Sequence, residues 1–128
     1  MERERKMAKT VLLVDDEPHI LELEKAILES EGFKTELASN GDEALQKLKS
    51  FKPDVVILDM MMPGMSGREV CENIRKDPNT KDLKVIFVTV ARFSEVGKEK
   101  LTEMKVTDYI TKPFDNADFV ARIRKATD

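Results

Sequence analysis

The sequence has few of the side chains that several kinds of site require. Its 128 residues include one cysteine and one histidine. A single cysteine excludes a disulfide within the chain and suits a reducing compartment, so we expect a cytoplasmic protein. With so few nitrogen and sulfur ligands available, a transition-metal site is not expected either.

Long apolar runs and an excess of basic charge are also missing. No apolar run approaches the roughly 18 residues that a membrane-spanning helix needs. The first nine residues, MERERKMAK, contain no apolar core of a signal peptide. The 22 basic residues are offset by 25 acidic ones, for a net charge of −3, and a nucleic-acid-binding domain would favour a basic surface. We therefore expect no direct partner among membranes or nucleic acids.

The residues that are present describe one folded domain. Hydrophobic residues make up 41% of the chain and charged residues 37%, which is typical of a globular protein. The length suits a single hydrophobic core. We expect residues 1–9 to be a flexible lead-in and residues 10–128 to form the domain.

Strand and helix patterns alternate along this domain. Strands are predicted at residues 10–14, 33–37, 55–58, 85–88 and 106–111. Helical patterns follow, beginning near Pro18, Asn40, Ser66, Ser94 and Asp115. This alternation predicts an α/β fold in which helices cover both faces of a parallel sheet. The helix from Ser94 to Met104 has a thin apolar face interrupted by Gly97, and we expect it to be the most mobile.

Within the helices, apolar spacing and end residues give more detailed expectations. In the first helix the inward stripe is predicted from Ile20, Leu23 and Ile27, widened by Leu21 and Leu28. The helix is expected to end at Gly32. Capping pairs three residues apart are predicted at Asn40 and Glu43, at Ser66 and Glu69, and at Asp115 and Asp118.

Polar residues stand where four of the predicted strands end. Asp15 and Asp16 follow the first strand, Asp59 the third, Thr89 the fourth and Lys112 the fifth. The carboxyl ends of parallel strands share one edge of the sheet, where ligands of such folds bind. We therefore expect these five side chains to meet at one site.

Three carboxylates in one site need a cation or protons, because a pair about 5 Å apart repels by roughly 3 kcal/mol at an effective dielectric of 20. With oxygen ligands alone, the expected cation is Mg²⁺, with Mn²⁺ or Ca²⁺ as substitutes. Lys112 and Thr89 would contact the oxygens of a phosphoryl group. The set is complete for in-line phosphoryl transfer to a carboxylate nucleophile, Asp59.

Four motifs in order carry a family resemblance: VLLVDDEP, VVILDMMMPGMSG, VIFVT and DYITKPF. They resemble the receiver domain of two-component response regulators, from about Thr10 to Lys125. The resemblance implies a flavodoxin-like (βα)5 fold with a five-stranded parallel sheet in the order 2-1-3-4-5. It also implies a switch rather than an enzyme, one that assists its own phosphorylation and slow dephosphorylation.

The same resemblance implies roles for individual residues. Asp59 would accept the phosphoryl group from a sensor histidine kinase or a phosphotransfer protein. Asp15 and Asp16 would hold Mg²⁺ together with Asp59 and the backbone carbonyl of Met61. Thr89 and Lys112 would bind the phosphoryl group, and the Lys112–Pro113 peptide would be cis.

The output of such a switch is also implied by the resemblance. Thr89 would move toward the phosphoryl group and Tyr109 would turn inward. This would change a surface formed by residues 94–125, on which an unknown downstream protein would bind. Val90 departs from the family, which usually has alanine or glycine after the threonine. We expect its bulk to slow both phosphorylation and hydrolysis.

The same residues also allow other interpretations. Asp15 and Asp16 would also suit the N-terminus of a helix. A degenerate receiver that acts only through protein contacts is one alternative function. A Mg²⁺-dependent phosphatase of the haloacid-dehalogenase type is another, but it needs an acid two residues beyond its nucleophile, where Asp59 is followed by Met61.

Overall fold

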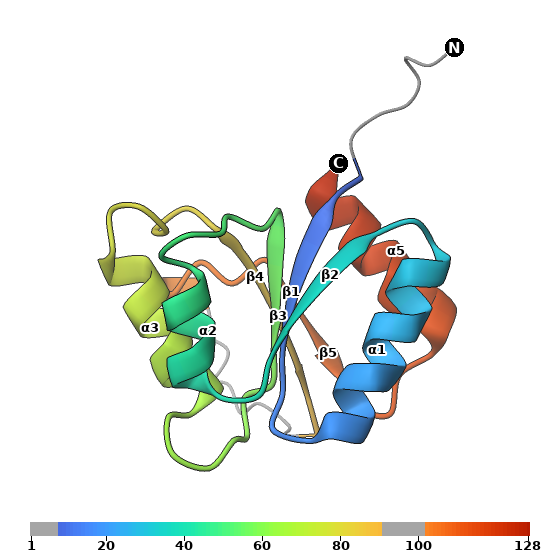
Figure 1. Ribbon diagram of the computed structural model, residues 1–128, viewed down its shortest axis with the longest axis horizontal. Helices are drawn as coiled ribbons and strands as arrows, with labels where there is room; N and C mark the ends of the chain where they lie inside the picture. The colour runs from blue at the N-terminus through green and yellow to red at the C-terminus, as the bar shows by residue number, and fades with distance from the viewer. Residues whose placement is uncertain (1–7, 91–101) are drawn as a thin grey trace.

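A five-stranded parallel sheet forms the centre of the computed structural model, which describes residues 8–90 and 102–128 (Figure 1). The strands are β1 (Thr10–Val14), β2 (Lys34–Ala38), β3 (Val55–Leu58), β4 (Lys84–Thr89) and β5 (Asp108–Thr111). Their order is β2-β1-β3-β4-β5, and every neighbouring pair is parallel. The expected flavodoxin-like fold and strand order are therefore confirmed.

Four helices in the described part of the chain cover the two faces of this sheet. They are α1 (Pro18–Ser30), α2 (Gly41–Lys47), α3 (Gly67–Lys76) and α5 (Asn116–Thr127). Helices α1 and α5 lie on one face, and α2 and α3 lie on the other (Figure 1). Most of the helix expected from Ser94 to Met104 lies outside the described residues, as does most of the flexible segment expected at residues 1–9.

Alternating strand side chains build a separate core under each pair of helices. On β1, Val11 and Leu13 face α1 and α5, whereas Leu12 and Val14 face α2 and α3. Strands β1, β3 and β4 are buried on both faces over most of their length, which explains why they appear in the sequence as continuous apolar runs. None of the helices in the described part of the chain has the length and apolarity that crossing a membrane requires.

The predicted helix ends are present in the structure. Gly32 has a φ of 94°, and its N–H donates to the carbonyl of Glu29 while the N–H of Phe33 donates to that of Leu28. This is a Schellman motif, which needs a residue that tolerates positive φ. The side chain of Asn40 caps α2, and Asp115 caps α5. Ser66 and Glu69 form a reciprocal capping box at α3.

The predicted inward stripe of α1 is wrong in part. Leu23 is 48% exposed, and the buried residues of the helix are Leu21, Glu24 and Leu28. These three are also spaced by three and four residues, so both stripes satisfy helical periodicity. The packing of α1 on the sheet selects the stripe that contains a glutamate.

Candidate functional site

The ends of β1 and β3 bring two of the predicted carboxylates side by side. Val14 is paired with Leu58, and the N–H of Asp59 donates to the carbonyl of Val14 at 3.0 Å. Asp15 and Asp59 are therefore adjacent residues at the carboxyl edge of the sheet. Carboxylate oxygens of Asp15, Asp16 and Asp59 all lie within 4.8 Å of one another. Such a cluster of hard oxygen donors suits a divalent cation.

Lys112 follows the last residue of β5, and its side chain reaches the carboxylate cluster. Its ammonium contacts Asp15 Oδ2 at 2.8 Å and Asp59 Oδ2 at 3.3 Å. Its backbone N–H donates to the carbonyl of Thr89 at 2.9 Å, which fixes the start of the loop after β5. The Lys112–Pro113 peptide is cis, as the family resemblance implied.

Strand alternation determines the side of the sheet on which each of these residues lies. Asp15 and Asp59 follow Leu13 and Ile57 two residues on, and those two residues pack beneath α1 and α5. Ile110, two residues before Lys112, packs in the same core. The two carboxylates and the lysine therefore project on the α1 side of the edge. Thr89 lies two residues after Phe87 on β4, and Phe87 packs on the side of α2 and α3. Thr89 is therefore on that side too, and it is fully buried.

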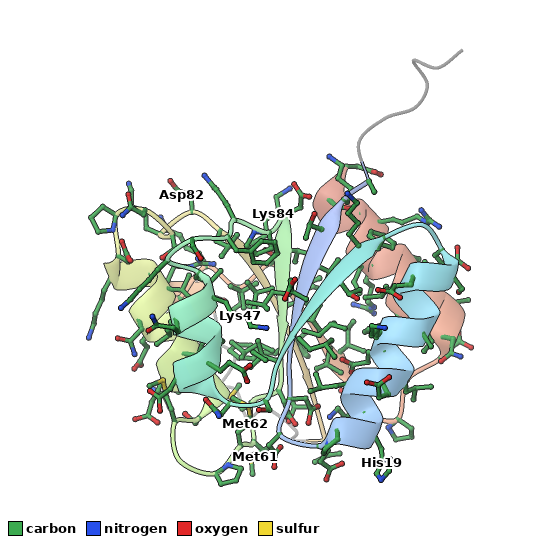
Figure 2. The ribbon with its side chains drawn as sticks, in the orientation of Figure 1. His19, Lys47, Met61, Met62, Asp82 and Lys84 are labelled. Carbon is green, nitrogen blue, oxygen red and sulfur yellow. The ribbon has the colours of Figure 1, made fainter. Side chains whose placement is uncertain are left out.

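The loop after β3 and the start of α3 contact Asp59 and fix its position. The N–H of Met61 donates to Asp59 Oδ1 at 3.0 Å, and the side chain of Met61 is 59% exposed whereas Met62 is buried. Figure 2 shows both methionines at this edge, with Asp82 and Lys84 at the opposite end of the sheet. Gly67 packs so tightly that a Cβ there would collide with the carbonyl of Asp59. Sequence reasoning missed that role of Gly67.

The buried charges change one another's proton affinity. Burial raises the pKa of the Asp59 carboxyl above its ordinary value, against the opposing hydrogen bond from Met61 and the charge of Lys112. Burial alone would lower the pKa of Lys112, but its hydrogen bond to Asp15 and the charges of Asp15 and Asp59 raise it. The raised pKa of Lys112 therefore reflects the carboxylates that share its ammonium, whereas the raised pKa of Asp59 reflects its burial.

A fourth carboxylate, which sequence reasoning missed, lies on the inner face of α1 near this site. Glu24 is 2% exposed, and burial raises the pKa of its carboxyl to about 8. Lys112 opposes that shift, while the charges of Asp15 and Asp59 reinforce it. The available signal was the spacing of Glu24 from Leu21 and Leu28, three residues after one and four before the other.

The helix-cap interpretation of Asp15 and Asp16 does not hold. The N-cap residue of α1 is Glu17, whose side chain makes no capping hydrogen bond. The N–H of Glu17 donates instead to Asp15 Oδ1 at 2.9 Å. His19 is exposed in the first turn of α1 (Figure 2), in keeping with a solvent-facing residue.

The residues implied in output and in kinetics lie around the same edge. Tyr109 on β5 is 37% exposed and Val90, directly after β4, is 65% exposed. An open hollow of about 450 Å³ lies beside Tyr109 and is also lined by Asp108 and Arg122. Residues 94–101, which begin the expected output surface, lie outside the described part of the chain.

Comparison with known proteins identifies the family. Residues 11–124 match the family described as the response regulator receiver domain. The chain belongs to this family. Receiver domains are components of two-component systems and interact with histidine kinases or phosphotransfer proteins.

Solved receiver structures are similar over nearly the whole chain. The response regulator TrrA of Thermotoga maritima, solved in complex with Mg²⁺ and BeF, is 40% identical, with a TM-score of 0.79; the match covers 92% of this chain and 98% of TrrA. A CheY-like receiver protein of Methanospirillum hungatei is 30% identical, with a TM-score of 0.87 and 94% coverage of both chains. The chemotaxis protein CheY4 of Vibrio cholerae is 28% identical, with a TM-score of 0.87, and the match covers 94% of this chain and 99% of CheY4.

Proposed function

We propose that this receiver domain accepts a phosphoryl group on Asp59 and acts as a switch rather than as an enzyme with a separate substrate. The observation that carries the proposal is the close grouping of Asp15, Asp16 and Asp59 beneath the Lys112 ammonium. A carboxylate nucleophile, a place for a cation and a positive charge for phosphoryl oxygens are the parts that such a transfer needs.

The cation proposed for this site is Mg²⁺, held by Asp15, Asp16, Asp59 and the backbone carbonyl of Met61. The carboxylate cluster supports this choice because hard oxygen ligands suit Mg²⁺, and Mn²⁺ or Ca²⁺ would be weaker candidates. The relative from Thermotoga maritima was solved with Mg²⁺. When bound, the ion supplies positive charge that offsets the repulsion between Asp59 and an incoming phosphoryl group.

The transfer itself is a displacement at phosphorus. A carboxylate oxygen of Asp59 forms the new O–P bond, while the N–P bond of a phosphohistidine on a kinase or phosphotransfer protein breaks. The histidine ring leaves with the bonding electrons and takes up a proton from solvent. Lys112 and Thr89 contact the phosphoryl oxygens, and Lys112 neutralises part of their charge.

The output proposed is a change of the surface formed by residues 94–125. Thr89 moves toward the phosphoryl group and Tyr109, exposed in the unphosphorylated protein, turns inward. A local change of charge would thereby alter a surface on which a downstream protein binds. Tyr109 also lines the open hollow beside Arg122, so its movement would reshape that hollow.

Acetyl phosphate with Mg²⁺ tests the proposal. Intact-protein mass spectrometry should show one added phosphoryl group in the wild type and none in Asp59→Asn. Equal labelling of both proteins would contradict the role of Asp59, and absence of labelling in the wild type would favour the unphosphorylated interaction module. Sustained hydrolysis of p-nitrophenyl phosphate would favour the phosphatase instead.

The departure at Val90 is tested in the same assay. Val90 is exposed beside Thr89, and we propose that its side chain hinders access to Asp59. Val90→Ala should therefore increase both the rate of phosphorylation and the rate of hydrolysis. Unchanged rates would show that its bulk is not limiting.

A further inference from the structure

Glu24 is a buried carboxyl for which the fold alone gives no reason. It lies on the inner face of α1 between the buried residues Leu21 and Leu28. Its carboxyl makes no hydrogen bond or ion pair with any residue in the described part of the chain, and its oxygens keep only slight contact with solvent. An unpaired carboxyl in an apolar core is costly, and a leucine at the same position would extend the apolar stripe.

The position of Glu24 relates it to the phosphorylation site. Helix α1 covers the face of the sheet on which Asp15, Asp59 and Lys112 project. Among the charged groups that act on Glu24, Lys112 has the largest effect, followed by Asp15 and Asp59. The effect is mutual, because Glu24 also contributes to the proton affinity of Lys112.

Lys112 needs another carboxylate partner when a divalent cation binds to Asp15 and Asp59. Both carboxylates that it contacts, Asp15 and Asp59, belong to the cluster proposed to hold the cation. A divalent cation there would compete with the ammonium for the same oxygens and would repel it. A lysine ammonium is a compact charge on a flexible stem and is able to change partner by rotating its side chain.

We propose that Glu24 is a positioning residue that receives the ammonium of Lys112 when a divalent cation occupies Asp15, Asp16 and Asp59. This inference rests on the proposed function of the site. In the cation-loaded protein, Glu24 keeps Lys112 inside the site instead of releasing it to solvent. The ammonium of Lys112 then stays close to Asp59, where it binds the phosphoryl oxygens once Asp59 is phosphorylated.

The raised pKa of Glu24 is consistent with this exchange. In the cation-free protein Lys112 is held by Asp15 and Asp59, so burial dominates and the Glu24 carboxyl favours its neutral form. A closer ammonium would favour the charged form. Glu24 and the cation therefore favour each other through Lys112.

The most direct test is a crystal structure of the full chain with Mg²⁺ and no phosphoryl donor. In that structure, Lys112 Nζ should lie within hydrogen-bonding distance of a Glu24 carboxylate oxygen. If Lys112 remains on Asp15 and Asp59, or extends into solvent, the proposal is wrong. This measurement needs no variant and so does not depend on the folding of one.

Mg²⁺ titration provides a second readout. Glu24→Gln and Glu24→Leu should raise the Kd for Mg²⁺ by about fivefold or more, because the displaced ammonium then lacks a buried carboxylate. Glu22→Gln, which removes an exposed carboxylate from the same helix, is the matched control and should leave the Kd unchanged. An unchanged Kd in both Glu24 variants, with folding verified by circular dichroism, would overturn the proposal.

The acetyl phosphate assay separates this inference from the proposed function. If the wild type is phosphorylated at Asp59 but Mg²⁺ leaves Lys112 in place, only the role of Glu24 fails. If Lys112 moves to Glu24 but Asp59 is never phosphorylated, the proposed function fails and the exchange of partners stands.

Discussion

Helices α1 and α3 cover opposite faces of the same sheet, and they are built differently. Helix α3 begins with a reciprocal capping box, has Glu69 in its first turn and basic residues in its last, and buries Val70, Cys71 and Ile74. Helix α1 has no side-chain cap, no acid in its first turn and no base in its last. It exposes Leu23 and buries Glu24.

The difference follows the side of the sheet on which Asp15, Asp59 and Lys112 project, which is the side that α1 covers. The carboxylates in front of α1 would be natural caps, but Asp15 contacts Lys112 and belongs to the acidic cluster. Glu24 is a charged residue on the buried inner face of α1, and the charge of Lys112 acts on it. Departures from the rules of stability are expected where a site requires them. Helix α3 approaches Asp59 through the backbone at Gly67, but its inner face packs Val70, Cys71 and Ile74 into the other core.

The largest expected effect on stability comes from truncating an apolar side chain on each helix and comparing the losses. Ile74→Ala on α3 should lower the free energy of unfolding by about 2–5 kcal/mol, because it leaves a cavity in a fully buried position. Leu23→Ala on α1 should change it by no more than about 0.5 kcal/mol, because that side chain is exposed. Urea denaturation measures both. Equal losses would mean that Leu23 belongs to the core after all.

The next effect is a dependence of stability on pH, to which Glu24 on α1 should make the largest contribution. Burial raises the pKa of Glu24 from an ordinary 4.5 to about 8. Between these values the folded protein holds a proton that the unfolded chain releases, so the free energy of unfolding should fall as the pH rises from about 4.5 to 8. The expected fall is on the order of a few kcal/mol.

Glu24→Gln is the control for that slope. The variant cannot ionise at position 24, so the fall in the free energy of unfolding should be much smaller. A remaining fall of the same sign is expected from Asp59, whose pKa burial also raises. Denaturation curves at several pH values measure both proteins. The same slope in the two proteins would show that Glu24 is not buried in solution.

A smaller effect tests whether Glu24 on α1 lowers the stability of the cation-free protein. Glu24→Leu should raise the free energy of unfolding of the cation-free protein by about 1–3 kcal/mol at pH 7, because it replaces an unpaired buried carboxyl with an apolar side chain. Thermal unfolding in the presence of EDTA measures the gain. A loss of stability would mean that the carboxyl already has a favourable partner without the cation.

The smallest effect concerns the two helix starts. Ser66→Ala should destabilise the protein by about 1 kcal/mol, because it removes one of the two side-chain hydrogen bonds of the capping box of α3. Glu17→Ala at the corresponding position of α1 should change little, because that side chain makes no capping hydrogen bond. Equal effects in urea denaturation would contradict the comparison.

Features governed by local rules were predictable from the sequence. Short apolar runs such as residues 55–58 predicted the strands, and alternation with helices predicted a parallel sheet. Ser66 with Glu69, and Gly32 at the end of α1, predicted helix ends that the structure contains. The meeting of Asp15, Asp59 and Lys112 followed because parallel strands deliver their carboxyl ends to one edge.

Features that depend on how elements pack were not predictable in the same way. In α1 two neighbouring stripes share helical spacing, one through Leu23 and one through Glu24. Hydrophobicity favours the first, but the orientation of the helix on the sheet buries the second. The close approach of Gly67 to the carbonyl of Asp59 depends on how α3 docks against the end of β3, and no local signal in the sequence marks it.

The sequence by itself determined the order of elements, the ends of several helices and the identity of the residues at the carboxyl edge of the sheet. These follow from backbone geometry, whose periods of two and 3.6 residues are properties of the chain alone. Only the tertiary structure decided which face of α1 is buried, and with it the burial of Glu24 and its field on Lys112. The physical reason is that burial and charge interactions depend on distances between segments far apart in the sequence.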